Sequence, residues 1–284
     1  MILSNITQAQ QFLPSLNLTL ENNRFNDFFR RAQEWLVSHI VGDGIEDILE
    51  IDMNVGEQDI HADLRLMCQR VIAEKALLDA IPEMDMQLTE AGFAVQNNQD
   101  FSPASSQRVD RLLAKMPERI AADVDALVRF LMKKSGTEQS AYSDWRSTDQ
   151  FKYLTAAFVP YFEEYNKIAL PKANTYETYY AALDTVAREM AKVADYYVSK
   201  AEVERLVELY RDGEALQVHR VAITELKVVG IAAFCGDMAH ARNAAVNARE
   251  TMLGSPDSFP EFKASSAFNS PTVNLDGGNM VNML

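Results

Sequence analysis

Residues 102–134, "SPASSQRVDRLLAKMPERIAADVDALVRFLMKK", decide the fold class because their apolar side chains recur at helical spacing. Ser102 and Pro103 form a helix start, with Ser as the N-cap and Pro at the first helical position. Pro117 either kinks the helix or divides it into two. The apolar stripe consists of Val109, Leu112, Leu113, Met116, Ile120, Val124, Leu127 and Leu131.

The same helical spacing recurs along most of the chain, so the sequence predicts a mainly α protein built from helical bundles. Ser199 and Gly213 are the expected start and stop signals of one of these helices. The small residues in the second half of the last helix predict close packing against its neighbours. Helices are expected over residues 23–42, 60–82, 176–198, 201–212 and, as one long helix, 216–252.

Residues 85–95, "DMQLTEAGFAV", interrupt the helical pattern. Two short runs flank the sequence Thr-Glu-Ala-Gly, which predicts one small β-hairpin with Gly92 at a positive φ. A hairpin of this size is marginally stable alone, so it must pack on neighbouring elements.

Composition changes at two further points and suggests a division into domains. Residues 133–149 are polar and contain a glycine, which is typical of a linker. The last thirty positions are rich in Asn, Ser and Gly without helical periodicity, which favours an extended C-terminal tail. We therefore expect an N-terminal helical domain over residues 1–135, a second helical domain over 136–254 and a tail over 255–284. A duplication relating the two helical parts stays open.

The net charge of −14 argues against a surface that grips nucleic acid. Residues 43–63 contain eight acidic side chains and no Lys or Arg. They lack the residue order of a calcium-binding loop, so we interpret the block as a solvated face or an interface edge.

The chain contains no apolar run of the ~20 residues that a membrane-spanning helix needs. Its first basic residue is Arg24, so the basic start of a signal peptide is absent. Cys68 and Cys235 are too few for a disulfide framework, which favours a reducing compartment.

No nucleophile, phosphate-binding or zinc motif appears in the sequence. Asp237 and His240 are three residues apart on a predicted helix and are the one pair placed to touch. We therefore expect no catalytic residues, no cofactor and no metal. A helical enzyme of unrecognised type is the alternative if these two side chains share a pocket with another acid.

Residues 81–95 and 102–115 carry a resemblance to a known family. They resemble uncharacterised proteins encoded in phages and prophages of Bacteroidales gut bacteria. Those proteins in turn look like head–tail connector (neck adaptor) proteins of tailed bacteriophages. The matching positions are Asp85, Leu88, Thr89, Gly92, Phe93, Val95, Ala104, Ser105, Arg108 and Val109.

This resemblance implies a structural virion protein that assembles as a homomeric ring, often twelve-fold, between the portal and the tail. The implied partners are the portal protein and tail or further neck proteins, with DNA only as passing cargo in the lumen and no membrane. The implied location is the neck of the virion, after assembly in the cytoplasm of the bacterial host. The alternative is a cytoplasmic helical adaptor or regulatory protein of a gut bacterium without catalytic activity.

We expect contacts between subunits at the hairpin with its following loop and at the C-terminal tail. A protruding hairpin and an extended tail are surfaces through which one subunit can clasp the next. The candidate interface residues are Gly92, Phe93, Val95, Phe101, Phe268, Val273 and Leu275.

Overall fold

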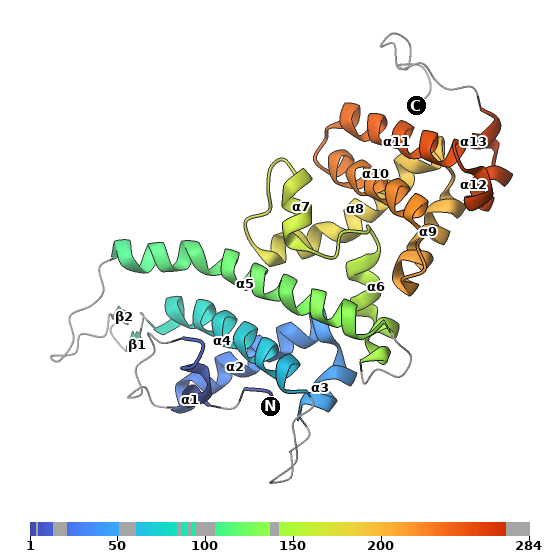
Figure 1. Ribbon diagram of the computed structural model, residues 1–284. Helices are drawn as coiled ribbons and strands as arrows, with labels where there is room; N and C mark the ends of the chain where they lie inside the picture. Colours follow the sequence, from blue (N-terminus) through green and yellow to red (C-terminus); the bar gives the residue numbers. More distant parts are fainter. Residues whose placement is uncertain are drawn as a thin grey trace.

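The computed structural model describes residues 1–3, 5–13, 22–50, 61–84, 87–89, 92–94, 106–136 and 142–270. This part of the chain is mainly helical, as the sequence predicts (Figure 1). None of its helices is both long and apolar enough to cross a membrane.

The N-terminal elements form a bundle in which α4 packs against both α2 and α5 (Figure 1). Helix α2 buries Phe25, Phe29 and Leu36, which share one helical face. A π-helical turn continues α2 over Val37–Val41 and ends at Gly42, whose φ is +73°. The elements of this part of the chain are α1 (Ile6–Ala9), α2 (Asn22–Leu36), α3 (Asp43–Glu50), α4 (Ala62–Met84), β1 (Gln87–Thr89), β2 (Gly92–Ala94) and α5 (Ser106–Lys134).

Helix α5 runs without a break through Pro117, so neither a division nor a second helix start is found there. Pro117 is half-buried, and the buried residues Met116 and Ile120 continue one face across it. The predicted helix start at Ser102 and Pro103 lies outside the described residues. In α4, Pro82 stands inside the last turn, two residues before the helix ends.

Strands β1 and β2 pair in antiparallel register, with Leu88 opposite Phe93 and Thr89 opposite Gly92. The positions around and between them, 85–86, 90–91 and 95–105, lie outside the described residues. The hairpin as a packed unit therefore stays a prediction beyond this backbone pairing.

The predicted linker over residues 133–149 is anchored to the N-terminal bundle by Trp145. The Trp145 side chain is 1 % exposed, and its indole N–H donates to the Ile40 carbonyl over 2.8 Å. One cluster of buried side chains extends from Ile2 to Ile231 in the sequence and contains Trp145. The predicted domain boundary between residues 135 and 136 falls inside this cluster.

The second half of the chain is a stack of shorter helices beside α5 (Figure 1). Ser199 and Gly213 bound α9 as predicted: the Ser199 hydroxyl accepts from the Glu202 amide, and Gly213 has a φ of +78°. The elements are a 3-10 turn (Ser143–Ser147), α6 (Asp149–Thr155), α7 (Phe162–Ile168), α8 (Tyr176–Tyr197), α9 (Lys200–Asp212), α10 (Gln217–Phe234) and α11 (Met238–Leu253).

The expected single helix over residues 216–252 is wrong, because the chain turns back between α10 and α11. Gly236 adopts a φ of +82°, which favours glycine, and the Asp237 carboxylate accepts from the His240 amide over 3.0 Å. The two helices then pack against each other and against α8. As expected, small buried residues on α11, among them Ala241 and Ala248, permit this close packing.

The expected extended tail is also wrong over residues 255–270, which fold as a 3-10 turn (Pro256–Ser258), α12 (Pro260–Ala264) and α13 (Ser266–Asn269). Phe259 and Phe262 are fully buried, which offsets the entropy of ordering this segment. The buried Glu202 carboxylate accepts from the Phe262 amide over 2.9 Å and so caps α12. Residues 271–284 lie outside the described residues.

Gly230 sets how closely α8 and α10 approach, which leads to a prediction. A Cβ at this position would lie 2.9 Å from the Val186 carbonyl oxygen and 3.0 Å from the Met190 Cβ. We expect Gly230→Ala to lower the free energy of unfolding by about 1–3 kcal/mol, because the two backbones must separate. Urea denaturation measures the effect. Gly44→Ala is the matched control, since nothing lies within 4 Å of the added Cβ, and it should cost no stability.

Candidate functional site

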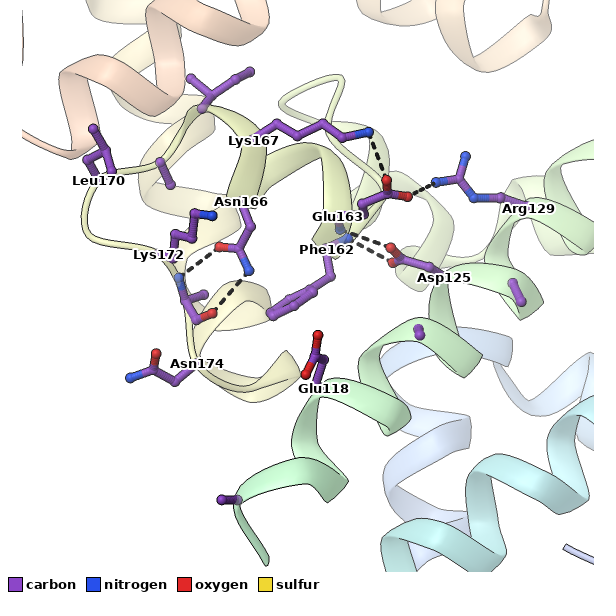
Figure 2. Close-up of a pocket in the computed structure, with 16 residues that line it drawn as sticks. Glu118, Asp125, Arg129, Phe162, Glu163, Asn166, Lys167, Leu170, Lys172 and Asn174 are labelled. Atoms are coloured by element: carbon purple, nitrogen blue, oxygen red, sulfur yellow. Dashed lines mark hydrogen bonds and ion pairs between the residues drawn. The ribbon is translucent and has the colours of Figure 1, made fainter. Parts of the chain in front are cut away.

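An open groove of about 1090 Å³ lies between α5 and α7, and the loop from α7 to α8 forms part of its wall (Figure 2). Alanines spaced along α5, among them Ala114, Ala122 and Ala126, contribute its small apolar lining. Charged and amide side chains stand around them (Figure 2). This combination of small floor and polar rim suits the close approach of another polypeptide segment.

The Asp125 carboxylate fixes α7 against α5. Its two oxygens accept from the Phe162 amide over 2.8 Å and from the Glu163 amide over 2.9 Å (Figure 2). These are the first amides of α7, which have no partner within their own helix. The cap is therefore supplied by a residue of another helix, and the groove wall is held by this contact.

Burial raises the pKa of Asp125 from its ordinary 3.8 to about 6. The two backbone amides and the Arg129 guanidinium favour the charged form and limit the rise. The Asp125 side chain is 5 % exposed, so removal from water is the larger effect.

Glu163 joins the two walls of the groove from the solvent side. Its carboxylate accepts from Lys167 over 2.8 Å and from the Arg129 guanidinium over 3.2 Å. The Lys167 ammonium lowers the pKa of Glu163. Arg129 also lies 4.0 Å over the Tyr161 ring. Arg129 is thus held in place from two sides.

The loop between α7 and α8 is tied to α7 by one amide side chain. The Asn166 side chain donates to the Ala173 carbonyl over 3.0 Å and accepts from the Ala173 amide over 2.8 Å (Figure 2). Leu170 stands at the outside of this loop and is 74 % exposed.

The predicted interface residues are not brought together in the described part of the chain. Gly92 and Phe93 lie in β2, and Val95, Phe101, Val273 and Leu275 lie outside the described residues. Phe268 lies in α13, where its ring contacts that of Phe262 at a centroid distance of 5.5 Å. Phe268 therefore packs against its own chain.

Asp237 and His240 have a structural role at the start of α11. The carboxylate caps the helix, and the His240 ring nitrogen lies 4.0 Å from it, with both side chains more than half exposed. Neither residue lines the groove. The described residues bring no three His, Cys, Asp or Glu side chains together as metal ligands. Burial raises the pKa of the Cys68 thiol to about 12, so this thiol stays protonated.

Sequence reasoning did not identify the groove. Asp125 reads as one more polar position on a helix, and its amide partners are 37 and 38 residues further along the chain. Pro160 and the acidic residues that follow it indicate that a helix starts there. They do not indicate that Asp125 caps this helix.

The raised pKa of Asp125 gives a prediction about stability and pH. The pKa of Asp125 is higher in the folded chain than in the unfolded chain. Its carboxyl group therefore contributes most to the free energy of unfolding below about pH 4, and this contribution is lost as the pH rises through about 6. We expect the stability of the wild type relative to Asp125→Asn to fall by on the order of 2–3 kcal/mol between these limits. Urea denaturation at a series of pH values measures this difference. Asp110→Asn, which removes an exposed carboxylate from α5, is the control, and an unchanging difference for Asp125→Asn would contradict the prediction.

Comparison with known proteins adds one relationship. Residues 31–155 match the model of a family of unknown function, DUF6712. The matched stretch runs from α2 to the end of α6 and crosses the predicted domain boundary at residue 135. No curated protein and no solved structure matches the chain.

Proposed function

We propose that this chain is a structural virion protein of a tailed bacteriophage, a head–tail connector or neck adaptor that forms a homomeric ring between portal and tail. The observation that carries the proposal is the resemblance of residues 85–109 to the phage and prophage family described above. Those residues lie within the stretch that matches DUF6712.

Two buried acids support a structural role because each one caps a helix. Asp125 caps α7 and Glu202 caps α12, each by accepting a backbone amide of another helix. Both carboxylates are thereby occupied in holding helices in place. The groove between α5 and α7 offers a contact surface whose shape these caps maintain.

The hairpin and the C-terminal residues are the finer part of the proposal. In a ring, the hairpin at Gly92 and Phe93 with the following loop to Phe101 would contact one neighbour. Because residues 255–270 pack on their own subunit, the clasp on a neighbour is assigned to residues 271–284, including Val273 and Leu275. The proposed partners are the portal protein and tail or further neck proteins, and the proposed location is the virion neck.

The mass of the purified protein tests the proposal. A ring-forming subunit should self-associate across the micromolar range into a closed species whose mass is a fixed multiple of 31.9 kDa. Sedimentation velocity and native mass spectrometry measure this, and proteomics of purified particles detects the protein in virions. A strict monomer that is absent from virions would contradict the proposal and favour a cytoplasmic helical adaptor of the bacterial host.

Deletion of residues 271–284 tests the assigned clasp separately. We expect the shortened chain to keep the helical signal and melting temperature of the full chain, because the buried Phe259 and Phe262 remain. Its self-association should weaken, as measured by sedimentation velocity. A loss of monomer stability would instead mean that these residues pack on their own subunit.

A further inference from the structure

Another, smaller cleft lies where a short loop joins α9 to α10 (Figure 1). Its volume is about 310 Å³. Sites for small molecules range from about 300 to 1,000 Å³, so this cleft suits a small molecule rather than a polypeptide segment. The cleft is lined by Tyr210, Gly213, Ala215, Arg220, Ile223, Thr224 and Lys227.

Both charged side chains that line this cleft are cations, although the chain as a whole has a net charge of −14. Arg220 and Lys227 are seven residues apart on α10, so they project from the same face of the helix. Asp212 and Glu214 flank Gly213 in the sequence, and neither of them lines the cleft. The described lining of the cleft therefore favours an anion.

The Arg220 guanidinium is held at one end and free at the other. Its Nε donates to the Ala215 carbonyl over 3.0 Å, which orients the planar group. Its two Nη atoms have no partner among the described residues, and the side chain is exposed. A guanidinium can donate two parallel hydrogen bonds to two oxygens of one oxyanion. Arg220 is therefore oriented and available to bind such a group.

Lys227 and Tyr210 supply further donors. The Lys227 ammonium donates to the Glu164 carboxylate of α7 over 3.2 Å, which leaves two of its three protons for another acceptor. The Tyr210 ring contacts that of Phe158 at a centroid distance of 5.5 Å, and its hydroxyl forms no hydrogen bond with a described residue. Burial raises the pKa of Tyr210, so this hydroxyl stays protonated and can donate. With Glu164 counted against the two cations, the site keeps a positive charge.

We infer that this cleft binds the phosphate group of a small phosphate ester. The donors come from two sides, with Arg220 and Lys227 on α10 and Tyr210 on α9. A tetrahedral phosphate accepts hydrogen bonds from several directions, whereas the oxygens of a carboxylate lie in one plane. The buried side chains of Ala215 and Ile223 form an apolar wall for the carbon part of the ester. This binding site does not depend on the proposed function.

Titration at constant ionic strength, with chloride exchanged for the added anion, tests the inference. We expect inorganic phosphate to shift the amide NMR signals of Gly213, Ala215 and Thr224 until they saturate, with a midpoint in the millimolar range. Glycerol 3-phosphate should bind more tightly, because its carbons can contact the apolar wall. Acetate should bind more weakly than inorganic phosphate, because a planar carboxylate meets fewer of the donors.

Two variants and a matched control connect the binding to this cleft. Arg220→Gln should weaken phosphate binding at least about tenfold, because it removes hydrogen bonds between charged groups. Tyr210→Phe keeps the ring contact with Phe158 and should weaken binding about threefold through the loss of one neutral donor. Lys192→Gln removes an exposed cation of α8 that does not line the cleft, so it should bind phosphate as the wild type does. Circular dichroism with thermal melting checks the fold of each variant.

Three results would overturn the inference: no saturable shift with phosphate, acetate binding as tightly as phosphate, or unchanged phosphate binding by Arg220→Gln. Glycerol 3-phosphate binding no more tightly than inorganic phosphate would contradict the ester as the ligand. None of these results changes the self-association of the chain, so the proposed function is tested separately.

Discussion

The Asp125 carboxylate accepts hydrogen bonds from the first two free amides of α7, and the position of this helix between α5, α8 and α10 depends on that contact. Once α7 is fixed to α5, the Glu164 carboxylate can meet the Lys227 ammonium of α10 over 3.2 Å. On the other side, the Tyr179 hydroxyl of α8 donates to the Val159 carbonyl just before α7 over 2.6 Å. A short helix with few contacts of its own thus becomes the link between α5, α8 and α10. Its seven residues are too few to form a stable helix alone. The hydrogen bonds from Asp125 therefore provide part of the stabilisation that this short helix needs.

The same device appears at the C-terminal end, where Glu202 caps α12. In both places a carboxylate is removed from water, and this burial raises its pKa. The hydrogen bonds from backbone amides offset part of the desolvation free energy of the charged group. Such contacts give short helices a defined position without a large core.

The sequence predicted those features whose signals are local. Helix α9 was bounded correctly because Ser199 and Gly213 act on their own neighbours, and the mainly helical fold followed from apolar spacing. The turn at Gly236 and Asp237 was missed because the stripe of small residues continues on both sides of it. The packing of residues 255–270 was missed because frequent Ser and Asn obscure Phe259 and Phe262. The groove was missed because Asp125 and the amide that it caps are 37 residues apart, and such a contact produces no periodic pattern in the sequence. Long-range partners of single polar side chains are the part of this fold that one sequence does not reveal.

Amide hydrogen exchange at the start of α7 tests the central claim most directly. In the wild type, the Phe162 and Glu163 amides donate to the Asp125 carboxylate and should be protected from exchange. In Asp125→Ala, these two amides should exchange at least about tenfold faster, while the amides in the middle of α4 keep their protection. Unchanged protection of the two α7 amides in Asp125→Ala would contradict the account.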